Sequence, residues 1–206
     1  MSWQHVWRMV PALLLLTLVL AGCGDPYLSA INPQAPVAQE QYDLLLFVGA
    51  LMTIIIVVVA VLFIIVLIRF RERPGQTGYP KQVEGSLKLE IIWTAIPLLI
   101  LAVIAVPTVT MTFSLAEDYS DDPNTINVKV TAYQYWWEFE YTDLGIHTAQ
   151  ELVLPTNQRV FFELTSKDVI HSFWVPALGG KIDTNPGLIN TMYLETSDVT
   201  GVFKGK

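Results

Sequence analysis

Two long runs of uncharged, mostly apolar residues constrain the fold of this chain more than any other feature. The first covers residues 44–68 and the second covers residues 91–113. At about 1.5 Å per residue the first run would form a helix about 37 Å long, which exceeds the roughly 30 Å hydrocarbon core of a bilayer. Because lipid offers the backbone no hydrogen-bond partner, the runs are predicted to be transmembrane helices at 44–68 and 90–113. Pro97 and Pro107 are each expected to remove a backbone donor and bend the second helix.

The segment between the two runs, residues 69–89, is rich in basic side chains. It carries Arg69, Arg71, Arg73, Lys81 and Lys88. An excess of Arg and Lys in a short loop predicts that the loop lies in the cytoplasm. The N-terminal part and everything after the second helix are then expected outside the membrane.

The N-terminus has the pattern of a secretion signal. Arg8 precedes a short apolar stretch at 9–20, and small residues lead to Cys23 in Leu20-Ala21-Gly22-Cys23. This pattern resembles the lipobox of bacterial lipoproteins, which implies a signal peptide at 1–22 and a lipid on the Cys23 sulfur, outside the membrane. An uncleaved anchor with a free thiol is the alternative. Residues 23–43, with three prolines, are expected to form an extracellular linker.

Residues 125–206 are predicted to form an all-β domain after an acidic linker at 114–124. Ile126, Val128 and Val130 alternate with polar residues, and the aromatic stretch 133–141 is interpreted as a strand that ends in a turn at 142–145. Further strands are expected at 151–154, 159–164 and 187–195. Short strands separated by Gly and Pro turns indicate a β-sandwich or barrel.

The net charge of the chain falls entirely after the second predicted helix, in the acidic linker and the predicted domain together. Thirteen Asp and Glu against six Lys and Arg follow Phe113, which accounts for the whole net charge of -7. Such a surface repels nucleic acid, which is therefore excluded as a partner, and it suits a basic protein. Simple solubility explains it equally well.

His171, one of three histidines, stands in Asp168-Val169-Ile170-His171-Ser172-Phe173-Trp174-Val175-Pro176. An imidazole at a strand end beside a proline turn is a candidate metal ligand. The alternative is a partly buried histidine that is hydrogen-bonded to the backbone.

Glu90 stands at the cytoplasmic mouth of the second predicted helix, in Leu89-Glu90-Ile91-Ile92-Trp93-Thr94-Ala95-Ile96-Pro97. A carboxylate at the edge of a membrane helix is a candidate proton-path group. It would equally complement the helix N-terminus, for about 0.3–1 kcal/mol.

Several motifs in the right order resemble subunit II of the haem-copper oxidases. They are the helical hairpin with its Glu90 entry, the aromatic stretch 133–143, the run 170–176 and the run 178–187. With the lipobox, the chain is similar to subunit II of a bacterial cytochrome c oxidase of the lipoprotein kind. The resemblance implies a cupredoxin-like Greek-key ectodomain that holds the dinuclear copper centre CuA.

The resemblance assigns roles to individual residues. His171 matches the first copper-ligand histidine, and Glu90 matches a glutamate at the mouth of the K-type proton path. The remaining copper ligands of the family lie in a Cys-x-Glu-x-Cys-x3-His-x2-Met run, which residues 1–206 do not contain. We therefore expect that the chain is truncated before this run, and that CuA does not assemble on residues 1–206 alone. Asp183 matches an acidic residue near the magnesium and proton-exit region, or is a solvated turn aspartate, and Leu188 departs from the arginine common there.

Three consecutive aromatic residues are candidates for electron entry. The tryptophan that the family uses aligns with Tyr135, and Trp136 and Trp137 follow it. Strand alternation would put Tyr135 and Trp137 on one face and Trp136 on the other. The sequence leaves open which of the three takes the role.

The resemblance implies an enzyme subunit of the respiratory chain that passes electrons from cytochrome c through CuA to haem a of subunit I, where oxygen is reduced and protons are pumped. The expected partners are subunit I with its haems, other oxidase subunits, the lipid membrane and a cytochrome c that is soluble, anchored or fused. The expected location is a bacterial cell membrane, with a lipid-anchored N-terminus and the ectodomain on the outer face. One alternative is a quinol oxidase subunit II without CuA, and another is a membrane lipoprotein with a β-sandwich binding module.

Overall fold

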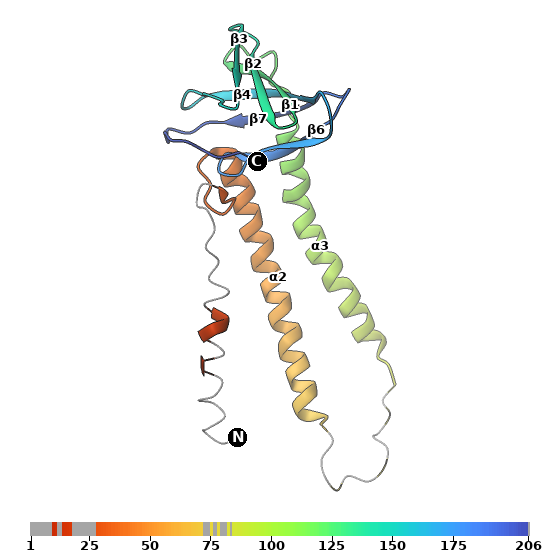
Figure 1. Cartoon of the computed structure of the whole chain (residues 1–206). Helices are drawn as coiled ribbons and strands as arrows, with labels where there is room; N and C mark the ends of the chain where they lie inside the picture. The colour runs from red at the N-terminus through yellow and green to blue at the C-terminus, as the bar shows by residue number, and fades with distance from the viewer. Residues whose placement is uncertain are drawn as a thin grey trace.

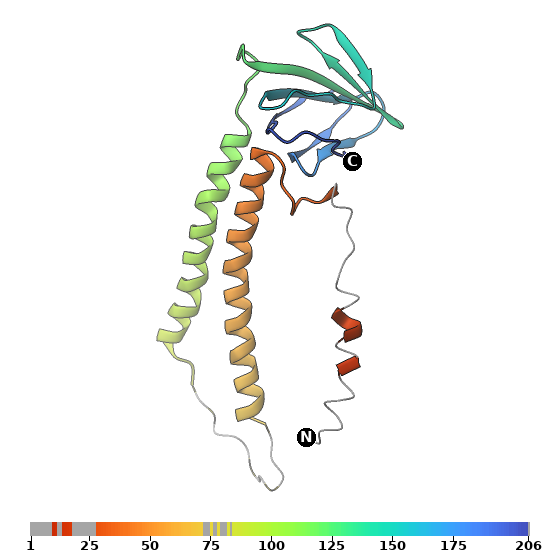
Figure 2. The same cartoon turned by 90° about the vertical axis from the view of Figure 1, so that its left-hand side faces the viewer.

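Two long helices run side by side and carry a β domain at one end (Figures 1 and 2). The computed structural model describes residues 10–11, 14–17, 28–71, 75, 78, 82 and 84–205. Helix α2 spans Pro36–Arg69 and α3 spans Leu87–Leu115, and both are long and apolar enough to cross a membrane. The predicted pair of membrane helices is thereby confirmed, and Cys23 lies outside the described residues.

The helices extend beyond the apolar runs that predicted them. Helix α2 begins at Pro36 and not at 44, so the expectation of an extended linker over 23–43 is wrong from residue 36 onward. Proline is favoured in the first turn of a helix because its missing N–H has no acceptor there. Pro97 and Pro107 both lie inside α3, which stays one continuous helix.

The ectodomain consists of seven strands in two sheets within the described residues. A five-stranded sheet has the order β3-β2-β1-β4-β7, in which β1 and β4 are parallel and the other pairs are antiparallel; a separate antiparallel hairpin joins β5 and β6. The strands are β1 Thr125–Tyr133, β2 Trp136–Tyr141, β3 Ile146–Ala149, β4 Arg159–Ser166, β5 His171–Val175, β6 Gly179–Thr184 and β7 Asn190–Glu195. This arrangement confirms an all-β domain behind a helical hairpin.

Three predicted strands differ from the observed ones. The stretch 133–141 is not one strand, because Tyr133 pairs with Trp136 across a tight turn at 134–135. Residues 151–154 form no strand, since the Tyr141 hydroxyl binds both the N–H and the C=O of Val153, each at 2.8 Å. The strand predicted at 187–195 begins only at Asn190, after a turn in which Gly187 has φ +76°. The predicted turn at 142–145 is confirmed.

The core lies between the five-stranded sheet and the β5–β6 hairpin. Phe162, Leu164 and Leu194 are almost fully buried. Phe173 of β5 packs against Phe162, with ring centroids 5.6 Å apart. Apolar contact of this kind, more than backbone hydrogen bonds, therefore joins the hairpin to the sheet.

The acidic linker after α3 is held against the sheet by an aromatic and ionic cluster. Arg159 at the start of β4 lies 4.0 Å from the ring centroid of Tyr119 and 2.6 Å from Glu195. Tyr119 meets Tyr193 of β7 edge to face, with ring centroids 4.8 Å apart. Tyr119 thus fixes the linker after α3 to two strands of the sheet, β4 and β7.

Candidate metal and electron-entry site

His171 is the first residue of β5, and its side chain is 21% exposed. Its Nε2 lies 2.6 Å from Oδ1 of Asp168, three residues earlier in the chain. The partner of the imidazole is therefore a carboxylate. The alternative considered from the sequence, a histidine hydrogen-bonded to the backbone, had named a different partner. A carboxylate that holds one ring nitrogen fixes the orientation and tautomer of the ring, which leaves Nδ1 as the nitrogen suited to bind a metal.

Asp168 organises the loop around the imidazole. Its Oδ1 accepts the N–H of Val169 at 2.6 Å, and its Oδ2 accepts the N–H of Gln134 at 2.5 Å. The hydrogen bond from His171, followed by these backbone N–H groups, holds the pKa of Asp168 well below its usual range, against the opposing effect of burial. Asp168 thus joins the His171 loop to the β1–β2 turn, which lies far away in sequence.

The three candidate aromatic residues occupy different environments. Tyr135 lies in the β1–β2 turn and is 91% exposed. Trp136 stacks on Tyr133, with ring centroids 4.4 Å apart. Trp137 points toward the hairpin, where its ring centroid lies 6.0 Å from that of His171 and 5.6 Å from that of Phe173. The predicted shared face of Tyr135 and Trp137 is wrong, because Tyr135 does not belong to the strand.

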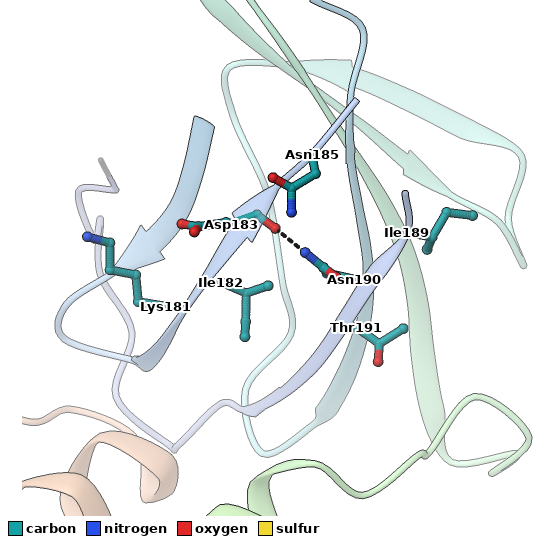
Figure 3. A pocket seen from close by; sticks show the side chains of 7 residues that line it. All are labelled: Lys181, Ile182, Asp183, Asn185, Ile189, Asn190 and Thr191. Atoms are coloured by element: carbon teal, nitrogen blue, oxygen red, sulfur yellow. Dashed lines mark hydrogen bonds between the residues drawn. The ribbon is translucent and has the colours of Figure 1, made fainter. Parts of the chain in front are cut away.

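Asp183 lies within β6, directly opposite Ser172 and next to the pair of His171 with Thr184. The Ser172 hydroxyl donates a hydrogen bond to its carboxylate. Its backbone oxygen accepts Nδ2 of Asn190 at 2.6 Å (Figure 3). Asp183 is therefore an ordered strand residue and not a turn aspartate.

An open pocket of about 670 Å³ lies beside Asp183, between β6 and β7. Figure 3 shows side chains from both strands around it. Its lining is polar and carries charges of both signs, from Lys181, Ile182, Asp183, Asn185, Ile189, Asn190 and Thr191. Across the ranges that the structure describes, no group of three or more His, Cys, Asp and Glu side chains could hold a metal.

Glu90 lies in the first turn of α3, at the end of the helices far from the β domain (Figure 1). Its backbone oxygen accepts the hydroxyl of Thr94 at 2.9 Å. A shallow groove runs along the helix beside it, lined by Glu90, Ile91, Thr94, Ala95 and Leu98. This position is compatible with both a proton-path group and a charge that complements the helix N-terminus, and it separates Glu90 from the His171 site.

Sequence reasoning missed the role of Asp168, although the spacing Asp-x-x-His offered a signal. A short-chain carboxylate three residues before a histidine can reach the imidazole across a turn. The bond from Asp168 to Gln134 could not be foreseen, because it depends on the tertiary contact between two distant loops.

Comparisons with known proteins match both the membrane part and the β domain of the chain. A family model for the transmembrane domain of cytochrome c oxidase subunit II matches residues 29–111, and one for its periplasmic domain matches residues 145–206. Cytochrome c oxidase subunit 2 of Alkalihalophilus pseudofirmus is 47% identical, covering 99% of this chain and 60% of the relative. That of Bacillus sp. strain PS3 is 51% identical, covering 97% and 59%.

Quinol oxidase subunit 2 of Bacillus cereus is also related, at 38% identity over 97% of this chain and 69% of the relative. The identity to the two cytochrome c oxidase subunits is higher. The chain spans about 60% of the length of those two relatives.

Proposed function

This chain belongs to the cytochrome c oxidase subunit II family, and from that premise we propose that it acts as the electron-entry subunit of a respiratory cytochrome c oxidase. Electrons pass from cytochrome c toward haem a of subunit I, which carries the oxygen-reducing site. The cupredoxin-like form of the ectodomain is what this family implies. The observation that carries the proposal is the contact of Trp137 and Asp168 with one imidazole, His171, at an exposed aromatic turn.

His171 is proposed as one ligand of the family's copper centre, through Nδ1. The described residues offer no set of three metal ligands, and residues 1–206 do not contain the family's Cys-x-Glu-x-Cys run. These residues alone therefore do not fit a dinuclear copper centre, and no electron-transfer step through copper is derived from them. What this chain supplies is an imidazole whose direction is set by Asp168 and whose ring makes a T-shaped contact with Trp137.

The three aromatic residues differ in their suitability for electron entry. Tyr135 is the outermost ring, and Trp137 is the ring in contact with His171. Trp136 is stacked away on Tyr133. We assign electron entry to Tyr135 on the outside and Trp137 on the inside, with Trp136 as support for the turn.

The acidic ectodomain surface suits a basic cytochrome c. Glu138 and Glu140 lie on β2, the strand that leaves the aromatic turn, and their carboxylates lie 3.7 and 3.9 Å from the ring nitrogens of His147 on β3. Carboxylates around an exposed aromatic centre attract and orient a cationic partner. Such a contact weakens with added salt, because the Debye length shrinks.

The test uses the protein expressed from its complete reading frame and assembled with its oxidase partners. His171→Ala is expected to remove the near-infrared CuA band and cytochrome c oxidation. His147→Ala, at an exposed site on β3, is the matched control for the copper ligand and is expected to leave the CuA band in place. An unchanged band in His171→Ala would sink the ligand assignment.

A quinol oxidase subunit II without copper is the second candidate, because a relative of that kind is 38% identical over nearly the whole chain. Oxygen uptake with reduced cytochrome c or with a quinol separates the two candidates. Uptake driven by quinol alone, in a preparation free of copper outside the haem–copper centre, would establish the second candidate. Membership in the oxidase family argues against a plain lipoprotein binding module.

The proposed location is a bacterial cell membrane, crossed twice, with the ectodomain and Cys23 on the outer face. Lipid on Cys23 would appear as fatty-acid label that is lost in Cys23→Ser, and label retained in that variant would contradict the anchor.

Glu90 is proposed at the proton-path mouth, so Glu90→Ala should slow proton uptake and leave the copper spectra unchanged. Asp183 is proposed to lie near the magnesium region of the assembled oxidase.

A further inference from the structure

The first turn of the membrane helix α2 is buried in the ectodomain. Ala35, Val37 and Ala38 are only 3–5% exposed. Ala35 and Val37 belong to the same apolar cluster as Phe162 and Phe173. A helix that served only as a tether would leave these side chains in solvent, so this turn is part of the domain's core.

Hydrogen bonds join the same segment to the β5–β6 hairpin and to the residues that follow β7. The Gln34 N–H donates to the Ala177 oxygen at 2.8 Å, and the Gly180 N–H donates to Oε1 of Gln41 at 3.2 Å. The Ser197 hydroxyl donates to the Gln34 oxygen at 2.5 Å. The segment is therefore bound on both sides of the buried turn.

Gly179 makes the close approach possible. Its φ is +94°, and a Cβ at this position would lie 2.7 Å from the Ala38 nitrogen and 3.0 Å from the Val37 carbonyl carbon. Both neighbours are backbone atoms, so no side-chain rotation would relieve the overlap. Any larger residue at 179 must push the hairpin and the helix apart.

The hairpin stands outside the five-stranded sheet, so its contact with α2 adds to the apolar contacts that Phe173 makes with the sheet. Among the described residues, β5 and β6 form backbone pairs only with each other, and one isolated bridge, between Ser166 and Pro186, lies just beyond the end of β6. His171 begins β5, and Gly179 begins β6 at the opposite end of the hairpin. Figure 1 shows the end of α2 directly against β6.

We propose that residues 34–41, the first turns of α2 and the two residues before it, form a seat for the β5–β6 hairpin, that Gly179 is the positioning residue of this seat, and that the seat holds His171 at a fixed place relative to the membrane. The seat itself stands on the contacts above. Its use in electron transfer rests on the proposed function, since a relay needs a constant distance between donor and acceptor.

The test measures the distance between α2 and the His171 end of the hairpin in the full chain in detergent. Spin labels are placed at Ile56→Cys on α2 and Ile170→Cys before β5, both 66% exposed, in a background in which Cys23 and any further cysteine of the reading frame are replaced by Ser. Pulsed electron resonance should give a single narrow distance distribution. Adding Gly179→Ala is expected to shift or broaden it.

Gly187→Ala is the matched control for this variant. Gly187 also has a positive φ, +76°, but a Cβ there meets nothing within 4 Å. The two variants share the backbone strain, and only Gly179→Ala creates an overlap with α2. Equal distributions in the two variants, at temperatures where both remain folded, would overturn the proposal.

A second pair of variants tests the seat from the helix side and serves if Gly179→Ala does not fold. Ala38→Val enlarges the buried face of α2, and Ala50→Val makes the same change at an exposed position of the same helix. Only Ala38→Val should alter the label distance, and an unaltered distance would refute the seat. None of these measurements needs copper, so a failed seat is distinguishable from a failed ligand assignment at His171.

Discussion

Truncating Phe173 should test how the β5–β6 hairpin is held. Phe173 is 5% exposed and makes ring contacts with Trp137, Phe139 and Phe162 at 5.6, 6.2 and 5.6 Å. Burial of a phenylalanine side chain is worth about 1.5–3 kcal/mol, and the cavity left by Phe→Ala raises the cost to about 3–5 kcal/mol. We expect the upper part of that range, because each lost ring contact adds about 0.5–1.5 kcal/mol.

The assay is denaturant unfolding of the ectodomain in the detergent-solubilised chain, followed by near-ultraviolet circular dichroism. Phe70→Ala, at a position 74% exposed, is the control and should change the free energy of unfolding by less than about 0.5 kcal/mol. Phe173→Leu keeps most of the apolar volume and should cost less than Phe173→Ala. A loss below about 1 kcal/mol for Phe173→Ala would refute the view that apolar contacts join the hairpin to the sheet.

Three further variants probe single contacts. Because the pKa of Asp168 is lowered in the folded protein, its carboxylate stabilises the fold at pH values above the usual aspartate pKa, and this stabilisation is lost as the pH falls below that value. Asp168→Asn should therefore flatten the acid side of a curve of unfolding free energy against pH. Parallel curves for the two proteins would contradict this. Arg159→Ala removes the ion pair with Glu195. Since both side chains are 31% exposed, we expect the free energy of unfolding, measured by thermal unfolding, to fall by about 1 kcal/mol. An unchanged free energy of unfolding would show that the pair does not stabilise the fold. Tyr141→Phe removes the hydroxyl that accepts the Val153 N–H, so the Val153 amide should exchange faster with deuterium and the free energy of unfolding should fall by about 1–2 kcal/mol. Unchanged exchange would refute the role of this hydrogen bond.

The membrane helices could be predicted from the sequence because lipid imposes one rule on every residue of a span. Their ends could not, since the first turn of α2 is stabilised by the ectodomain and not by lipid. Nothing in the sequence around Val37 and Ala38 indicates that these two residues are buried in the β domain. Their burial depends on Gly179, which lies far along the chain and whose left-handed backbone is visible only in three dimensions.

Strand alternation gave the right faces where a partner strand was present. Val128 and Val130 are buried, and Ile126, which was expected on the same face, is partly buried and packs against the core. The same alternation failed at Tyr135 and at 151–154, for different reasons. A tight turn between paired residues does not interrupt the aromatic pattern, and Leu152 and Leu154 alternate without a neighbouring strand to pair with.

At the candidate site, residue type predicted His171 and the aromatic stretch, but not their order in space. Asp168 was within the same nonapeptide, and its partner Gln134 was not. Which aromatic ring touches the imidazole followed from the direction of β2, which the sequence left open.

The presence of Ala35 and Val37 in the ectodomain core has a consequence for biogenesis. These residues leave the ribosome before the apolar runs of both membrane helices, whereas the sheet they pack against begins at Thr125. The core can close only when its early and late parts meet on the same side of the bilayer. Folding of the ectodomain is therefore conditional on correct insertion of both helices, and a misinserted chain would expose an incomplete core to quality control.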